Sequence, residues 1–258
     1  MNGFLRSALI LLGTAALAGA AQNDAVTWKP IGETLGRAGE LAADGSYKVT
    51  ILREDVAVKT ANGMPVPAGL GLNSYAAFTG TPDDATVVGD TCLLEHEVNP
   101  EIDALRAGGL EVVAIHNHML SDSPRLAFLH FQGRGNGVKL AGTIRQAWDL
   151  LGKVKPPAPT PVGSAPAVDA AALATILKRP APATGGAVAK FTLPRTDLDI
   201  RLDGRKLVPG VGLACWAAFT GCPCGKTMVM GDTCVTRDEL QLAMDALRRG
   251  GIRITGIH

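Results

Sequence analysis

The order of apolar and polar stretches predicts helices and strands in a regular sequence along the first half of the chain. Extended runs rich in β-branched residues are followed by turn signals such as Asn62-Gly63. Gly108-Gly109 suits a helix C-cap that needs positive φ. The expected elements are a helix at Ile31–Leu41, strands at Tyr47–Val58, Ala76–Phe78 and Thr86–Asp90, a helix at Glu97–Arg106 and a strand at Glu111–Met119.

The second half of the chain repeats this order. Asp169 stands near the N-cap of its first helix, and Asp203-Gly204 marks a turn after an extended run. Thr236 and Glu239 have the spacing of a capping box. The expected elements are a helix at Val168–Leu177, strands at Ala189–Ile200, Ala217–Phe219 and Thr227–Asp232, a helix at Asp238–Arg249 and a strand at Arg253–His258.

The repetition extends to the residues themselves. Gly89–His116 and Gly231–His258 align without gaps at an offset of 142 and agree at 13 of 28 positions. Two shorter matches precede them in the same order, Tyr75–Gly80 with Trp216–Gly221 and Lys48–Arg53 with Lys190–Arg195. Chance does not produce three ordered matches, so the chain contains a duplicated unit. We predict an α/β (α+β) fold of two tandem strand-helix-strand units with a mixed sheet and a pseudo-two-fold arrangement.

The duplication also predicts domain boundaries. We expect a signal peptide at 1–20, a first repeat unit at 21–152, a Pro/Ala-rich linker at 153–167 and a second unit at 168–258. A further helix is expected at Val138–Leu151. The second copy stops at His258, the counterpart of His116, and nothing in it matches Asn117–Gly133. Either the chain is a fragment or the second unit has lost its last hairpin, and we expect a fragment with a truncated second copy.

The N-terminus has the three-part pattern of a secretory signal peptide. One positive charge precedes an uncharged apolar stretch, Ser7–Ala20, and small residues at Ala18 and Ala20 suit cleavage before Ala21. The alternative is a membrane anchor, but about 20 apolar residues are needed to cross a bilayer and this run is shorter. We therefore expect an exported protein, periplasmic or secreted, with no membrane span beyond this segment.

Charge and composition exclude some classes of partner. The chain carries 25 Lys+Arg against 24 Asp+Glu, so its net charge indicates neither nucleic acid nor an anionic surface as a partner. Aromatic residues make up only 4% of the chain. A stacking platform for bases is therefore not expected.

The five histidines of the chain are unevenly distributed, and three of them lie in one short segment. His116 and His118 are two residues apart, so on a strand they share a face. Ser121–Pro124 is a turn signal, which makes the segment a β-hairpin, and an even pairing register would place His130 on the same face. Direct pairing of His116 with His130 centres the turn on Ser123. Three converging imidazoles would leave a fourth position open for a metal, and we expect zinc or copper there.

Other interpretations of this segment stay open. One of the histidines can be a hydrogen-bonded core residue, or all three can form a solvated stripe. Asp90 and Glu97 are the candidate acids for a catalytic role, although a turn explains Asp90 and helix capping explains Glu97, which recurs as Glu239. Asn117 and Met119 are expected to face away from the histidines, which does not favour a thioether ligand.

Five cysteines lie in a chain that we expect in an oxidising compartment. Cys92 and Cys234 are equivalent, so they can form a disulfide across a pseudo-two-fold axis or remain two separate thiols. The turn Cys222-Pro223-Cys224 can bind a soft metal or pair with Cys215. Because the count is odd, at least one thiol stays unpaired.

Four stretches of the chain resemble the LppY/LpqO-type family of exported bacterial proteins: YKVTILREDVAV, GLNSYAAFTGTPDDATVVGD, EVNPEIDALRAGGLEVVAIHNHM and AIHNHMLSDSPRLAFLHFQGRG. The resemblance covers roughly Ile31–His258. It implies a two-repeat protein of the bacterial envelope or exterior, and it implies little about activity because the family is mainly uncharacterised. Some relatives are lipoproteins, whereas no cysteine here lies in or just after the N-terminal segment.

Three functional hypotheses follow. In the first, the protein binds a transition metal at His116, His118 and His130. In the second, the same metal activates water or oxygen in a hydrolase or oxidoreductase, with Glu97 or Asp90 as the general base. In the third, the histidines line a pocket for an unknown small molecule without metal.

Overall fold

The structure is a computed structural model that describes residues 18–158, 163, 166–180 and 188–258, with side chains described from Thr27 onward. The described chain divides into two compact units. The first comprises the residues up to Pro156 together with Met244–His258, and the second comprises Pro157–Ala243.

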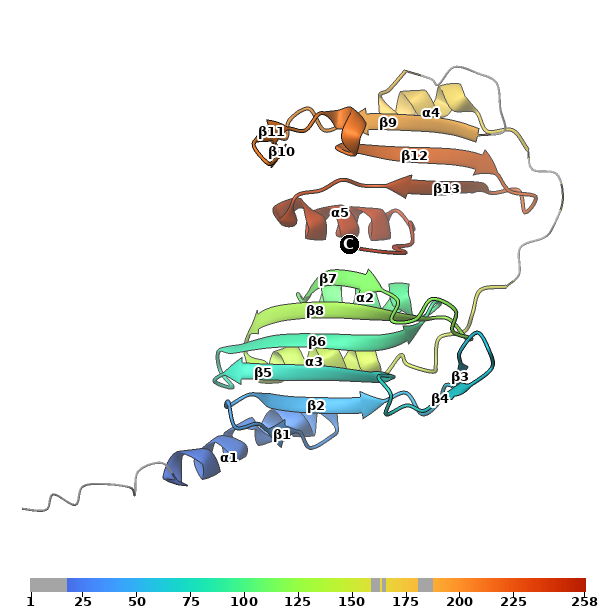
Figure 1. Ribbon diagram of the computed structural model, residues 1–258. Coiled ribbons are helices and arrows are strands. Elements are labelled where there is room, and N and C mark those ends of the chain that lie inside the picture. Colours follow the sequence, from blue (N-terminus) through green and yellow to red (C-terminus); the bar gives the residue numbers. More distant parts are fainter. Residues whose placement is uncertain (1–17, 159–162, 164–165, 181–187) are drawn as a thin grey trace, which may run out of the picture. The chain divides into compact units, whose positions relative to one another are not determined.

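The first unit is built on one six-stranded antiparallel sheet (Figure 1). From edge to edge its strands are β1 (Glu40–Leu41), β2 (Tyr47–Leu52), β5 (Asn73–Gly80), β6 (Ala85–Leu94), β8 (Leu126–Gly135) and β7 (Glu111–His116). The predicted α+β class is confirmed, but the predicted mixed sheet is wrong. Strands β6 and β7 run in the same direction on either side of a helical crossover, and β8 lies between them, so every neighbouring pair is antiparallel.

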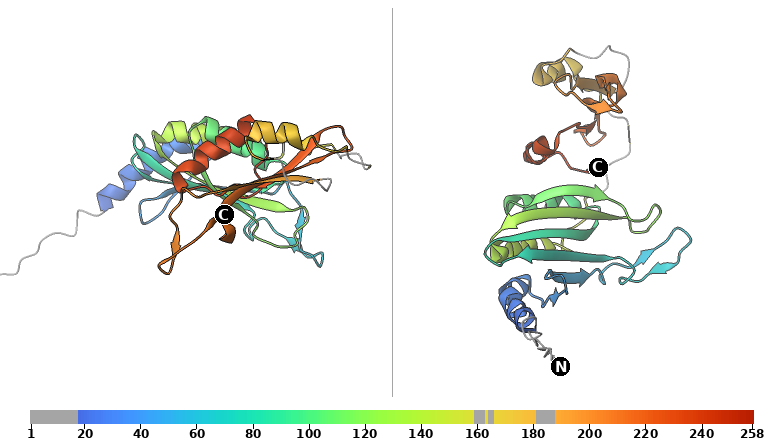
Figure 2. Two further views of the ribbon diagram at one scale, coloured as in Figure 1. Left: turned by 90° about the horizontal axis from the view of Figure 1, so that it is seen from above. Right: turned by 60° about the vertical axis from the view of Figure 1, so that its left-hand side comes forward.

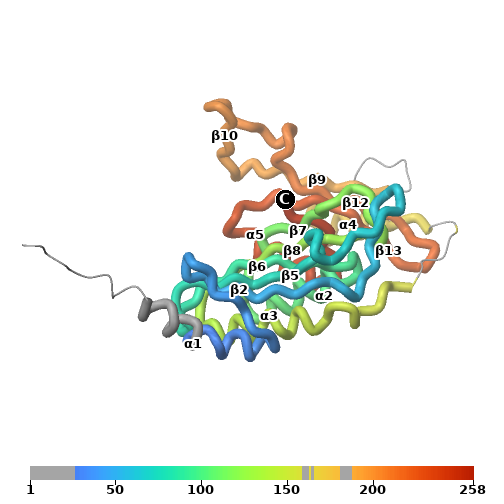
Figure 3. Tube along the Cα trace, turned by 60° about the horizontal axis from the view of Figure 1, so that its bottom comes forward, coloured from blue at the N-terminus to red at the C-terminus, as the bar shows by residue number. Residues whose placement is uncertain are grey.

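Three helices cover one face of this sheet (Figures 1, 2 and 3). They are α1 (Ala18–Leu35), α2 (Val98–Ala107) and α3 (Gly137–Trp148). The core lies between these helices and the sheet, where Phe131 and Ile144 are buried. Gly89 is required in this layer, because a Cβ there would lie 2.1 Å from an atom of the Phe131 ring. The Trp148 indole also donates a 3.1 Å hydrogen bond to the Thr91 hydroxyl.

The opposite face of the sheet is only partly covered. A small hairpin of β3 (Val58–Lys59) and β4 (Pro65–Val66) packs over it. Below this hairpin lies a second apolar cluster, made of Val58, Val66, Leu72, Cys92, Leu126 and Phe128. The rest of this face carries polar side chains, including Lys48, whose ammonium lies 4.3 Å from the centre of the Tyr75 ring. The candidate site lies on this face.

The last residues of the chain belong to the first unit and contact it through equivalent positions of the repeat. Helix α5 spans Arg237–Arg249. Arg106 pairs with Asp245, and Arg248 pairs with Asp103, so each ion pair joins the arginine of one helix to the aspartate of its counterpart. Ile115 likewise forms a backbone bridge with Ile257, its own equivalent. These reciprocal contacts follow directly from the duplication.

The second unit repeats the central strands of the first. Its three-stranded sheet has the order β13 (Thr227–Asp232), β12 (Ala214–Gly221) and β9 (Val188–Pro194), matching β6, β5 and β2. The predicted N-cap of α4 (Ala170–Leu177) is confirmed, because the Asp169 carboxylate accepts from two backbone amides. The shorter elements are β10 (Arg201–Leu202), β11 (Arg205–Lys206) and a 3₁₀ turn at Pro209–Val211.

Several predicted element boundaries are wrong. The strands predicted to end at Val58 and Ile200 end at Leu52 and Pro194, and the predicted strand Arg253–His258 is reduced to an isolated bridge at Ile257. The first helix ends at Leu35 because Gly36 adopts a φ of 73°. The strand predicted to end at Asp90 continues to Leu94, which pairs with Leu126. The strand predicted to run to Met119 ends at His116.

The N-terminal segment and the linker are described only in part. Residues 1–17 of the expected signal peptide, and residues 159–162 and 164–165 of the expected linker at 153–167, lie outside the described residues. None of the helices in the described part of the chain combines the length and apolar character that a membrane crossing requires.

Candidate functional site

The histidine segment forms the end of the β7–β8 hairpin, on the sheet face that carries no helix. Ala114 pairs with His130, and His116 pairs with Phe128. Directly opposed residues share a face and faces alternate along each strand, so His116 and His130 project from the same side. The even register expected for the hairpin is therefore confirmed.

The residue opposite His130 is nevertheless not the one predicted. His130 lies across from Ala114, two residues from His116, because the turn is centred on Asp122 instead of Ser123. The Asp122 carboxylate accepts a hydrogen bond from the Leu126 amide at 2.9 Å, and the Asn117 amide donates to the Leu126 carbonyl. These two side chains hold the start of β8 and thereby set the register. Asn117 points away from the histidines, as expected.

The rings of the three histidines gather in spite of the shifted register. The Nε2 atoms of His116 and His130 lie 2.7 Å apart, and the two ring centres are 4.8 Å apart. The ring of His118 stacks on that of His116 with a centre distance of 5.3 Å. Because β7 ends at His116, strand alternation does not position His118. Instead its ring stacks on Phe128 at 3.3 Å between centres.

Phe128 is the residue of this cluster that the sequence interpretation missed. It is buried, and it lies two positions before His130 on the same strand and face. That spacing was readable in the sequence, but an aromatic residue next to histidines is normally assigned to the core. Phe128 belongs to the core cluster beneath the β3–β4 hairpin and also forms the surface on which His118 rests.

Asp90 is also part of this cluster. It pairs directly with His130 on one side and with Tyr75 on the other, in the middle of β6, so the predicted turn role is wrong. Its side chain is only 6% exposed, and its Oδ1 atom has no hydrogen-bond partner among the described residues. Burial raises the pKa of the Asp90 carboxyl, while the charges of His130 and His116 act in the opposite direction.

The electrostatics of the cluster favour neutral imidazole at His118. Burial lowers the pKa of this ring, and the neighbouring charges of His116 and His130 lower it further. Neutral imidazole is the form that binds metal ions. It also accepts a proton, so the same arrangement suits either metal binding or proton transfer.

The positions of the histidine rings do not yet match those of ligands on a metal ion. Among the residues that the structure describes, no three His, Cys, Asp or Glu side chains are arranged to hold a metal ion. Two nitrogen ligands on a tetrahedral zinc ion lie roughly 3.3 Å apart, given bonds of about 2.0–2.1 Å. The 2.7 Å separation of His116 and His130 is that of a hydrogen bond, so these rings must move apart slightly to share an ion.

Glu97, the second candidate acid, has a structural role. Its side chain is 1% exposed and pairs with Arg53, which is 2% exposed. It also accepts hydrogen bonds from the backbone amides of Leu94 at 2.8 Å and Gly152 at 2.7 Å. With both oxygens engaged, Glu97 is not available as a general base.

The cysteines do not pair as the repeat symmetry allowed. Cys92 and Cys234 are both free, so a disulfide between them is excluded in this structure. Cys222 is bonded to Cys224, and Cys215 is free. Burial raises the pKa of the Cys92 thiol to about 12, which makes it a poor nucleophile.

This pairing predicts the thiol content of the oxidised protein. In denaturant without reductant we expect three reactive thiols, those of Cys92, Cys215 and Cys234. Titration with a chromogenic disulfide reagent measures this number. After reduction all five should react. Five reactive thiols before reduction would contradict the disulfide.

Comparison with known proteins places the chain in a family. A family model described as Domain of Unknown Function (DUF1259) matches residues 29–150 and 171–258, and the chain belongs to this family. The two matched segments correspond to the two copies of the repeat. No curated protein and no solved structure matches the chain.

Proposed function

We propose that this protein binds a transition metal ion through His116, His118 and His130. The observation that carries the proposal is the convergence of three imidazoles on an exposed sheet face, with two Nε2 atoms 2.7 Å apart. Imidazole nitrogens are ligands for zinc and copper, and three of them leave a coordination position open.

The surroundings of the cluster support this proposal. Asp90 supplies a buried carboxylate beside His130, where it can orient that ring or take part in coordination. Phe128 gives His118 an apolar backing and limits its rotation. A small rotation of the exposed His116 ring away from His130 makes room for an ion between the two Nε2 atoms.

Two finer assignments belong to the same proposal. The HNHM segment and the two-repeat organisation support membership of the LppY/LpqO-type group of exported bacterial proteins. The pattern at Ser7–Ala20 supports a signal peptide and a periplasmic or secreted location. Sequencing of the N-terminus of the mature protein tests the location, with Ala21 as the expected first residue.

A second candidate function is catalysis by a metal ion bound at the same three histidines. The Asp90 Oδ1 atom has no hydrogen-bond partner among the described residues, so it is free to accept a proton from a metal-bound water. This observation favours a metal-dependent hydrolase or oxidoreductase in which Asp90 takes the role that Glu97 cannot. An Asp90→Asn variant that keeps its metal but loses hydrolysis of 4-nitrophenyl acetate would support the reaction.

The metal content of the purified protein tests the proposal. We expect near-stoichiometric zinc or copper in protein prepared without chelator, and loss of most of it in His116→Ala and His130→Ala variants. Elemental analysis by mass spectrometry measures both. His96→Ala is the matched control, because His96 is outside the three-histidine cluster and its loss should leave the metal content unchanged.

One result would overturn the metal proposal. If neither the parent nor the variants bind zinc or copper on re-addition, while circular dichroism shows that they are folded, the cluster is not a metal site. The remaining interpretation is then a hydrogen-bonded histidine pair in a ligand-binding module.

A further inference from the structure

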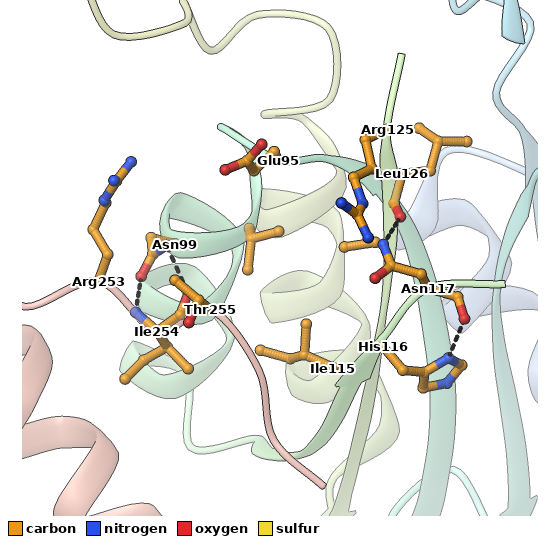
Figure 4. Close-up of a pocket in the computed structure, with 12 residues that line it drawn as sticks. Glu95, Asn99, Ile115, His116, Asn117, Arg125, Leu126, Arg253, Ile254 and Thr255 are labelled. Carbon is orange, nitrogen blue, oxygen red and sulfur yellow. Dashed lines mark hydrogen bonds between the residues drawn. The ribbon is translucent and has the colours of Figure 1, made fainter. Parts of the chain in front are cut away.

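A cavity of about 300 Å³ lies beside the hairpin, and His116 and Asn117 are among the residues that line it. It is formed by the start of α2, the adjoining ends of β7 and β8, and the segment Arg253–Thr255. Figure 4 shows that the Ile115 side chain points into it, whereas the His116 ring points away. Its volume is at the lower end of the range for small-molecule pockets.

The floor of this cavity is apolar. Val98, Ile115, Leu126 and Ile254 line it, and each is at most 9% exposed. The Asn99 side chain donates to the Ile254 carbonyl at 3.0 Å and accepts from the Ile254 amide at 2.7 Å. Asn99 therefore holds the C-terminal segment in place as the wall of the cavity, and both of its polar atoms are engaged.

Charged groups line the rim. Arg125 and Arg253 lie on opposite sides of the cavity in Figure 4, with Glu95 between them. Two guanidinium groups against one carboxylate leave an excess of one positive charge. Among the described residues, neither arginine has a hydrogen-bond or ion-pair partner for its side chain.

Arg125 and Arg253 differ from five other arginines of this unit. Other arginines of the unit form ion pairs with carboxylates, namely Arg53, Arg106, Arg134, Arg145 and Arg248. A guanidinium presents its donors in a planar fork that matches a carboxylate or phosphate. The two unpaired guanidinium groups lie above apolar side chains. This arrangement suits a ligand that joins an anionic group to a hydrocarbon part.

We infer that this cavity binds a small organic acid, with Arg125 and Arg253 holding the acidic group and the apolar floor holding the carbon chain. Glu95 accepts a hydrogen bond from a donor on the ligand, and it repels ligands with several negative charges. This inference does not depend on the metal proposal, because His116 is the one member of the histidine cluster that lines the cavity, and its ring points away from the cavity in Figure 4.

Calorimetric titration with model acids tests the inference. We expect saturable binding of hexanoate or of hexyl phosphate, and the stronger of the two identifies the acidic group as carboxylate or phosphate. Hexylamine has the same chain and the opposite charge, so it should bind much more weakly. Removal of either guanidinium in Arg125→Ala or Arg253→Ala should weaken binding roughly ten- to hundredfold, the range for a lost charge-assisted hydrogen bond.

Matched controls separate this site from the others. Arg37→Ala removes an exposed arginine outside the cavity lining and should not change the affinity. His130→Ala tests the metal cluster and should leave acid binding intact, so the two proposals fail independently. No saturable heat with either acid would overturn the inference. So would unchanged affinity in both cavity arginine variants, or hexylamine binding as tightly as the acids.

Discussion

Replacement of Glu97 by alanine is expected to lower the free energy of unfolding of the first unit by about 3–5 kcal/mol, a change of roughly a hundredfold or more in the unfolding equilibrium. The reason is the buried Arg53 guanidinium, whose Nη1 lies 2.8 Å from a Glu97 oxygen. Without Glu97, this cation keeps the Cys92 carbonyl and a single carboxylate partner, Asp55, which is 47% exposed. The amides of Leu94 and Gly152 also lose their acceptor.

The repeat supplies a matched control for this prediction. Glu239 is the counterpart of Glu97, and it makes the same bonds to Arg195 and to the Thr236 amide. Its side chain is 45% exposed, so water replaces these partners when it is removed. We therefore expect Glu239→Ala to destabilise its unit far less than Glu97→Ala destabilises the first.

Native-state hydrogen exchange followed by peptide mass spectrometry measures both effects. Peptides from β6 and α2 report on Glu97→Ala, and peptides from β9 and β12 report on Glu239→Ala. Separate peptides are needed because a chain with two units does not unfold in one two-state step. Equal losses of protection in the two variants would contradict the argument from burial.

Stability of the first unit is also expected to fall as the pH rises from about 5 to 8, and Glu101 is the cause. Burial raises the pKa of this carboxyl to about 8, and the nearby charge of Glu97 adds to the rise. The folded state therefore keeps a proton that the unfolded chain releases near its ordinary value of 4.5. The stabilisation is complete below that value and is lost as the pH rises through about 8.

The expected slope is about 1.4 kcal/mol per pH unit, or roughly 3–4 kcal/mol over this range. Glu101→Gln should flatten the profile, because the amide has no proton to lose. Urea unfolding at several pH values measures the slope in a Trp216→Phe background. The remaining described tryptophans, Trp28 and Trp148, are both buried in the first unit and report on it alone.

The repeat again offers a comparison. The position equivalent to Glu101 is Ala243, so the repeated architecture does not require an acid there. A Glu101→Ala variant should also remove the pH dependence, although it leaves a cavity where the glutamate was. A profile as steep in Glu101→Gln as in the parent would show that another group controls this range.

The candidate site was only partly readable from the sequence. The spacing of His116 and His118, the turn signal after them and the later His130 were sufficient to predict a hairpin with histidines on one face. The contribution of Asp90 was not readable, because it depends on β6 lying next to β8, and these strands are separated by α2 and β7. Such long-range pairing is decided by packing of the whole sheet, and no local pattern encodes it.

What the sequence determined by itself is the duplication and the features that act within one turn or one hairpin. The offset of 142 is read directly from the sequence. The glycine pairs that end the helices, the Asp169 cap and the shared face of His116 and His130 follow from local rules of backbone geometry and hydrogen bonding. Tertiary structure alone decided that Glu97 forms an ion pair with Arg53 and that Asp90 lies beside His130. It also decided that Arg125 and Arg253 line the same cavity. These roles depend on burial and on neighbours distant in the chain. The same residue type is therefore structural at one place and free for chemistry at another.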